Sequence, residues 1–166
     1  TLKHCYTKLI HQLPLHQIIQ LKSGEENKTV KTCELIWEKL TQANADRNSL
    51  LINLGGGVIG DMGGFAAGCY KRGIKFINVP ATLLAMVDAS VGGKTGIDFI
   101  NFKNQIGLFN EPEAVLIDTD FLETLPEREL LSGFAEVIKH YLIADEKAFE
   151  EIRNQKSEIR NLKWDE

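Results

Sequence analysis

The chain has 166 residues, of which 43% are hydrophobic and 25% are charged, and its formal net charge is −4 at pH 7. This balance is typical of a globular protein that buries a core without disulfides or metals. Basic residues do not gather in runs and no apolar run reaches about 18 residues, which argues against a nucleic-acid surface, an anionic-membrane surface and a transmembrane helix. The cysteines, Cys5, Cys33 and Cys69, are odd in number and far apart, so we expect reduced thiols in a cytoplasmic protein.

The N-terminal third predicts helices that alternate with strands. Residues 2–13 carry apolar side chains at helical spacing, and 16–21 form a short strand candidate. A second amphipathic helix spans about 30–40. The continuous apolar run 49–54 then predicts a strand buried on both faces, as in a parallel sheet.

The same alternation continues to about residue 118. A glycine-rich helix follows at about 58–70, then a strand at 75–79, a short apolar helix at 81–89 and a strand at 114–118. Strands that alternate with helices predict a Rossmann-like, doubly wound α/β fold with a parallel sheet. Because the first element is a helix, this fold predicts a further strand before it, missing from the chain.

The pattern changes near residue 120. Thr124 and Glu127 have the spacing of a capping box, with Pro126 in the first helical turn. Helical periodicity then runs from Leu130 to Leu162, without another strand candidate. We therefore predict an α/β domain over residues 1–122 and the beginning of an all-helical, truncated domain over 123–166.

Residues 55–60, GGGVIG, match GxGxxG directly after a strand and before a helix. Glycines there let a pyrophosphate approach backbone N–H groups at the helix N-terminus. The acidic residue that usually follows about 20 positions later is absent. A nucleotide-binding turn and a plain packing turn both stay open.

The helix after this turn carries Asp61, which we place in its first turn. The carboxylate either favours the helix dipole or accepts a hydrogen bond from a ribose or amide. Gly63, Gly64 and Gly68 recur on the same helix, where each costs about 1 kcal/mol relative to alanine. We therefore expect close packing at these glycines.

The stretch DASVGGKTGID at 88–98 ends like a phosphate-binding Walker loop, but Asp88 stands where the first glycine belongs. A helix, not a strand, is predicted before it, which excludes that motif. A flexible loop that presents Lys94, Lys103 and Asn104 suits an anionic, oxygen-rich substrate. The alternative is a solvated surface loop.

Glu136 and Lys139 are three residues apart on the later helix, with His140 at the edge of the same face. An ordinary surface ion pair is the common interpretation of this spacing. However, Glu136 lies among apolar residues in a helix that is apolar nearly all round, so its carboxylate is also a candidate metal ligand. We assign no ligand role to the histidines near the N-terminus.

Together these stretches resemble the 3-dehydroquinate synthases, members of the sugar-phosphate cyclases. The similarity lies in GE-x-x-K (Glu25, Lys28), NLGGGVIGDMGGFAA, Lys71-Arg72-Gly73, PATLLAMVDASVGGKTGID, KNQIGLF and TLPERELLSGFAEVIKH, and extends over essentially the whole chain.

The resemblance implies an NAD-binding α/β domain and a helical domain, with NAD and a divalent metal (zinc, or alternatively cobalt) between them. It also implies that the enzyme is a homodimer and that it acts in the shikimate pathway. Its substrate would be a small sugar phosphate, 3-deoxy-D-arabino-heptulosonate 7-phosphate, converted to 3-dehydroquinate and phosphate. NAD would be regenerated in each turnover.

The resemblance also implies site residues. Substrate and catalysis would involve Lys94, Asn104, Lys139 and Arg72, the last across a dimer interface. NAD would be bound by Glu25, Lys28, Gly56, Gly57, Val58, Ile59, Gly60, Asp61, Ala81, Thr82, Asp88, Lys94, Lys103, Phe121, Leu122, Glu123 and Thr124. The metal would be bound by Glu136.

Two positions depart from the family: Ala81 replaces a frequent threonine and Asp98 a frequent asparagine. The two further metal-ligand histidines of the family would lie beyond Glu166, so we expect an incomplete metal site and an inactive chain. Two other functions stay open. One is another cyclase such as a 2-deoxy-scyllo-inosose synthase; the other is a non-catalytic nucleotide-binding module.

Overall fold

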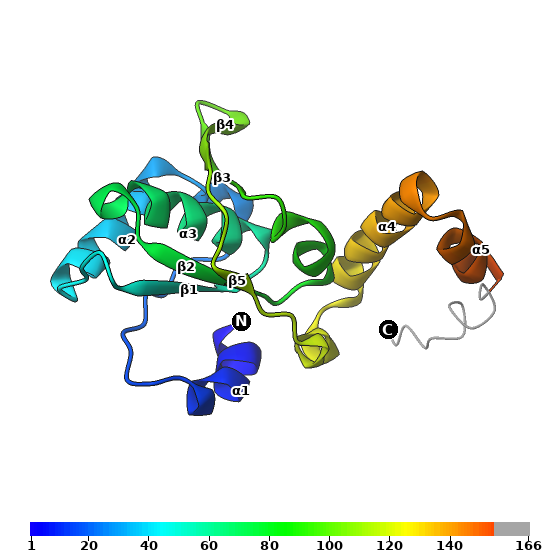
Figure 1. Cartoon of the computed structure of the whole chain (residues 1–166), viewed down its shortest axis with the longest axis horizontal. Helices are drawn as coiled ribbons and strands as arrows, with labels where there is room; N and C mark the ends of the chain where they lie inside the picture. The colour runs from blue at the N-terminus through cyan, green and yellow to red at the C-terminus, as the bar shows by residue number, and fades with distance from the viewer. Residues whose placement is uncertain (155–166) are drawn as a thin grey trace.

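The computed structural model describes residues 1–154 as an α/β body from which a helical arm projects (Figure 1). The strands are β1 (Leu50–Gly55), β2 (Lys75–Pro80), β3 (Lys94–Phe99), β4 (Phe102–Phe109) and β5 (Ala114–Val115). The helices are α1 (Thr7–Leu9), α2 (Val30–Gln42), α3 (Gly57–Cys69), α4 (Glu127–Ala144) and α5 (Glu146–Asn154). Short helical turns span Leu2–Tyr6, Ile10–Gln12, Glu25–Asn27, Tyr70–Arg72, Ala85–Ala89 and Thr119–Thr124. The predicted α/β class, with a parallel sheet followed by helices, is confirmed.

The main sheet has three parallel strands in the order β1-β2-β5. β1 and β2 pair along their whole length, from Leu50 opposite Lys75 to Gly55 opposite Pro80. Their carboxyl ends therefore meet at one edge of the sheet, where the chain leaves β1 for α3 and β2 for the segment 81–89. In such sheets this edge is where ligands bind.

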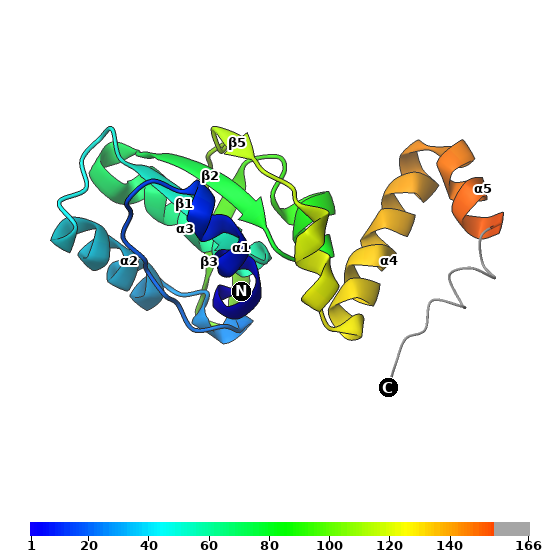
Figure 2. The ribbon, with the colours of Figure 1, turned by 90° about the horizontal axis from the view of Figure 1, so that it is seen from below.

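Side chains that alternate along the strands fill two cores on opposite faces of the sheet. One core joins α2, α3 and β3 around Phe76, which is 1% exposed. The other packs Val79 against Cys5 of the N-terminal helical turns and Phe121 of the turn after β5. Figure 2 shows the N-terminal turns in front of the sheet and α2 and α3 behind it.

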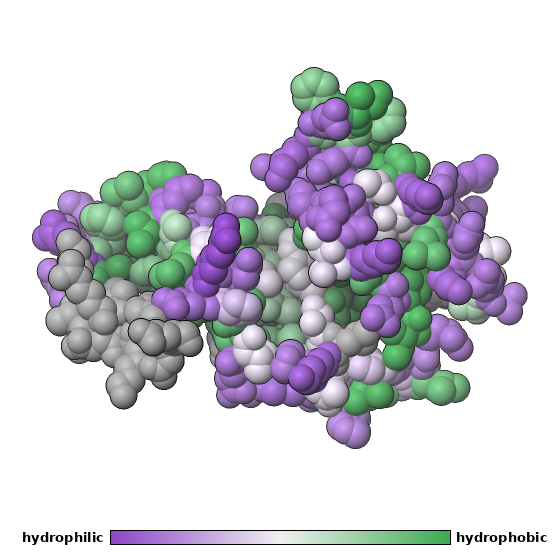
Figure 3. Space-filling view, turned by 180° about the vertical axis from the view of Figure 1, so that it is seen from behind, coloured by the Kyte–Doolittle hydropathy of each residue, from purple (hydrophilic) through white to green (hydrophobic). Residues whose placement is uncertain are grey.

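β3 and β4 form an antiparallel hairpin whose tip projects from the body (Figure 1). The flexible loop predicted for residues 94–107 is therefore wrong: this glycine-rich stretch is paired backbone, anchored by the fully buried Ile97. Hydrophobic side chains gather at the projecting tip (Figure 3), where Phe99, Ile100 and Phe102 are exposed.

Other predictions also need correction. Residues 16–21 are not a strand, because their backbone pairs with none of the strands described here; Ile19 and Leu21 nevertheless pack against the core. Thr124 does not cap α4, since that helix begins at Glu127 with Pro126 as its N-cap residue.

The helical arm differs from the prediction as well. α4 is not apolar all round, because only Gly133 is buried along it, and the helix breaks at Asp145 before α5. The predicted periodicity at Ile159 and Leu162 lies outside the described residues. No helix in residues 1–154 is long and apolar enough to cross a membrane.

Candidate functional site

The glycine turn links β1 to α3 as the sequence predicts. Gly56 is the N-cap residue of α3, and no side chain caps the helix, while the N–H groups of Ile59 and Gly60 bond the Gly56 carbonyl. The N–H groups at the start of the helix have no partner within it. Val58 belongs to the same first turn. The N-terminus of α3 is therefore open to an anionic group.

Segment 81–89 lies directly beside this turn. The N–H of Ala81 donates to the carbonyl of Gly55 at 2.8 Å, and a Cβ on Gly57 would lie 3.1 Å from that of Ala89. The hydroxyl of Thr82 accepts a hydrogen bond from the N–H of Ala85, the first residue of the turn Ala85–Ala89, at 3.2 Å. The predicted residues Ala81 and Thr82 are thus brought to the glycine turn.

A cleft of about 700 Å³ opens between α3, the turn Ala85–Ala89 and the hairpin. Four of its polar side chains were predicted as site residues: Asp61, Asp88, Lys94 and Asn104. An ammonium, an amide and two carboxylates around one cleft can bind a ligand that carries both hydroxyl and anionic oxygens.

Asp61 lies at the start of the second turn of α3 and not in the first turn as predicted, and its carboxylate is half-buried. Its Oδ2 is 2.6 Å from Nζ of the buried Lys28. Burial raises the pKa of Asp61, and the Lys28 ammonium opposes that shift. Nearby, Glu25 and Lys103 form an exposed pair at 3.2 Å, so two more predicted residues meet at the rim of this region.

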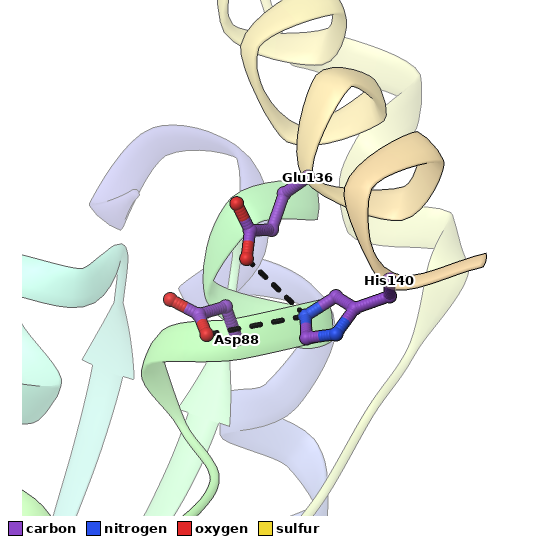
Figure 4. A group of neighbouring side chains, drawn as sticks. All are labelled: Asp88, Glu136 and His140. Atoms are coloured by element: carbon purple, nitrogen blue, oxygen red, sulfur yellow. Dashed lines mark ion pairs between the residues drawn. The ribbon is translucent and has the colours of Figure 1, made fainter. Parts of the chain in front are cut away.

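A second polar group joins Asp88 to Glu136 and His140 of α4 (Figure 4). His140 Nε2 lies 3.2 Å from Glu136 Oε1 and 4.0 Å from Asp88 Oδ1. One ligand atom from each of the three residues lies within 4.8 Å of the others. Two carboxylates and an imidazole are donors that suit zinc or cobalt.

The condition of Glu136 supports a cation at this place. Its Oε1 is buried and, among the described residues, has no partner in hydrogen-bond geometry, although Lys139 Nζ and His140 Nε2 lie beside it. The Glu136 carboxylate raises the pKa of the Lys139 ammonium, which lies beside Oε1. The residues present therefore fit a divalent metal. The sequence placed His140 at the edge of the face that carries Glu136 but gave it no ligand role, although its spacing of four from Glu136 was a visible signal.

Several predicted residues do not join this region. Arg72 follows the C-terminal end of α3, opposite the glycine turn. Phe121 is a core residue, with Leu122 packed beside it. Glu123 pairs with Lys8 at 2.8 Å on the surface, and Thr124 ends the same helical turn.

A glycine turn at the carboxyl edge of a parallel sheet, beside a polar cleft and a carboxylate–imidazole group, is the arrangement of a dinucleotide-type α/β domain. Comparison with known proteins is more specific. The model of the 3-dehydroquinate synthase N-terminal region matches residues 18–132. The chain belongs to the 3-dehydroquinate synthase family.

Curated relatives agree with this assignment. The chain is 50% identical over 149 residues to the 3-dehydroquinate synthase of Prochlorococcus marinus (strain MIT 9312), covering 89% of this chain and 41% of that protein. It is 51% identical over 157 residues to that of Pseudomonas fluorescens (strain SBW25), covering 93% and 43%. The chain thus spans about two fifths of the length of these relatives.

Solved structures of related cyclases share the fold. A 2-epi-5-epi-valiolone synthase from Streptomyces hygroscopicus subsp. jinggangensis 5008, with NAD+ and Zn2+ bound, has a TM-score of 0.80 at 31% identity, covering 84% of this chain and 39% of that one. A 2-deoxy-scyllo-inosose synthase complexed with carbaglucose-6-phosphate, NAD+ and Co2+ has a TM-score of 0.76 at 32% identity, covering 81% and 37%.

Proposed function

We propose that the protein containing this chain is a 3-dehydroquinate synthase, which converts 3-deoxy-D-arabino-heptulosonate 7-phosphate to 3-dehydroquinate and phosphate with NAD and a divalent metal. One observation carries the proposal: Asp88 belongs both to the cleft and to the group with Glu136 and His140. A substrate in the cleft would therefore contact the basic hairpin on one side and the metal-type ligands on the other. Relatives at about half identity support this enzyme within the family.

The residues of this chain have different roles according to their position in the site. When bound, NAD supplies a reversible hydride acceptor. When bound, the metal supplies a Lewis acid for a substrate oxygen. The open N-terminus of α3 binds the pyrophosphate at Gly56 and Gly57. Lys94 binds the substrate carboxylate and hydroxyl region, and Asn104 orients a neighbouring oxygen.

The metal would be bound by Glu136, with His140 and Asp88 as further donors. Lys139 then lies free to contact the substrate, as the resemblance implies. We also propose the division into an NAD-binding domain over 1–122 and a helical domain from 123. We further propose that the protein is a cytoplasmic homodimer in which Arg72 contacts the substrate phosphate bound to the partner subunit. Arg72 is exposed and lies away from the cleft of its own chain, which supports that role.

Phosphate release tests the proposal. The natural protein containing this chain is incubated with the heptulosonate phosphate, with and without NAD and a chelator, beside the 166-residue chain. We expect release that needs both NAD and metal, and none from the short chain. A Lys94→Ala variant should lose most of it, whereas Lys3→Ala, an exposed N-terminal lysine, should not. Release from a hexose 6-phosphate instead would favour a 2-deoxy-scyllo-inosose synthase. Binding of NAD without any release would favour a nucleotide-binding module.

A further inference from the structure

Lys28 is the most deeply buried charged side chain near the cleft, yet it does not line it. The residue is 3% exposed, and its Nζ donates to Asp61 Oδ2 at 2.6 Å and to Asn104 Oδ1 at 2.5 Å. Both acceptors do line the cleft. A buried ammonium is costly unless it is paired, so this double contact fixes all three side chains relative to one another.

The backbone closes the arrangement into a ring. The N–H of Asp98 donates to the Lys28 carbonyl at 2.9 Å, and the N–H of Asn104 donates to Asp98 Oδ1 at 2.8 Å. Asn104 itself has a positive φ of 54° in the middle of β4. Lys28 therefore ties the hairpin to α3 at the point where Asn104 enters the cleft.

The chemistry of the three groups sets which atoms a ligand meets. A lysine ammonium only donates, so Asn104 must turn Oδ1 toward it, and its Nδ2 amide is left to donate elsewhere. Asp61 likewise gives Oδ2 to Lys28 and keeps Oδ1 as an acceptor. One wall of the cleft thus presents an acceptor from α3, and the other presents a donor from the hairpin.

We propose that Lys28 is a positioning residue that sets this donor and acceptor pattern, by holding Asp61 on the cofactor side and Asn104 on the substrate side at once. The assignment of a cofactor side to Asp61 and a substrate side to Asn104 rests on the proposed function. This role is additional to the NAD contact that the resemblance implies for Lys28, because here the ammonium acts through two neighbours.

A double-mutant cycle separates these roles. In the natural protein, kcat/KM for the heptulosonate phosphate is measured at saturating NAD for Lys28→Met, Asn104→Ala and the double variant. Each single change should lower kcat/KM by about tenfold or more, because a charge-assisted hydrogen bond is lost. The double variant should lose clearly less than the product of the two single losses, because part of the effect of Lys28 passes through Asn104 and the rest through Asp61. Lys75→Met, which removes an exposed ion pair with Glu113, is the matched control and should leave kcat/KM unchanged.

Two results would overturn the proposal. One is a double variant whose losses multiply; the other is a Lys28→Met variant that weakens NAD binding alone and keeps kcat/KM at saturating NAD. If Lys28→Met does not fold, Lys28→Gln, which keeps a donor without the charge, takes its place in the same cycle.

A second measurement is independent of the reaction. Amide hydrogen exchange over residues 94–109 should become faster in Lys28→Met (or Lys28→Gln) and stay unchanged in Lys75→Met, because Lys28, unlike Lys75, contacts both the hairpin and α3. Unchanged exchange in the Lys28 variant would overturn the proposal. Absence of phosphate release from the unmodified protein would instead refute the proposed function, and the exchange result would still decide the role of Lys28.

Discussion

Gly63 on α3 offers a quantitative test of how this helix packs on the sheet. A methyl group at this position would collide with the side chain of Asn53, since a Cβ there would lie 2.8 Å from its Nδ2. That Nδ2 donates to Asn78 Oδ1 at 3.0 Å, and both asparagines are buried. Gly63→Ala therefore forces apart a buried hydrogen bond between β1 and β2.

The expected cost follows from three effects. Overpacking costs about 1–3 kcal/mol. The disturbed buried hydrogen bond adds about 1 kcal/mol. Replacing glycine by alanine in a helix recovers about 1 kcal/mol. We therefore expect Gly63→Ala to lower the free energy of unfolding by about 1–3 kcal/mol.

Gly60 is the matched control on the same helix. A Cβ on Gly60 would lie 3.9 Å from the side chain of Asn78, an ordinary contact, so Gly60→Ala should stabilise by about 0.5–1 kcal/mol. Urea unfolding of both variants, followed by circular dichroism at constant m-value, measures the difference. Equal effects of the two substitutions, or a stabilising Gly63→Ala, would refute the packing argument.

Three further predictions concern the metal group, the thiols and a helix cap. Glu136→Gln should weaken Co²⁺ binding by at least about tenfold, measured by titration of the visible absorption of Co²⁺. Glu150→Gln, which removes an ion pair with Arg153 on α5, is the control and should leave the affinity unchanged; equal affinities of the two variants would contradict the ligand role. Burial raises the pKa of Cys33 to about 11 from 9.0, so a thiol reagent at pH 8 should label the exposed Cys69 and spare Cys33 until the chain unfolds. The raised pKa of Cys33 contributes fully to the free energy of unfolding below pH 9.0, and this contribution, up to about 3 kcal/mol, is lost as pH rises through about 11. Cys33→Ala should therefore make the free energy of unfolding depend less on pH over that window, and an unchanged dependence would contradict this. Thr29→Ala removes the side-chain acceptor at the start of α2 and should cost about 1 kcal/mol in urea unfolding; no change would mean that the cap is replaced by water.

The elements with strong local signals could be predicted from the sequence. The apolar run at 49–54 and the glycines after it predict β1 and the start of α3 to within a residue or two. Burial on both faces requires consecutive apolar residues and a sharp turn requires glycines, and both are visible in the sequence. The recurrence of Gly63, Gly64 and Gly68 along α3 likewise predicted close packing, which the structure confirms.

Elements that depend on distant pairing could not be predicted. The hairpin at 94–109 has the composition of a loop, and only its partner strand and the burial of Ile97 make it a sheet. Residues 16–21 alternate like a strand because Ile19 and Leu21 face the core, yet no neighbouring backbone pairs with them.

The same distinction holds for the candidate site. Glu136, Lys139 and His140 share a helical face, and this was visible from their spacing. Their meeting with Asp88 was not, because it depends on how α4 leaves the body. The position of Lys28 between α3 and the hairpin depends on contacts 33 and 76 residues away in the chain.

The turn of the hairpin has a consequence for the order of its motions. Ile100 and Asn101 connect β3 to β4, and both have positive φ, at 45° and 64°. Two-residue turns of this kind favour asparagine and glycine, and a β-branched isoleucine is strained there. The tip therefore supplies little of the cohesion of the hairpin, which comes from its buried base. Fluctuations should begin at the tip and travel inward, so that the turn opens and closes while Asn104, three residues after the turn, is held by its contacts with Lys28 and Asp98.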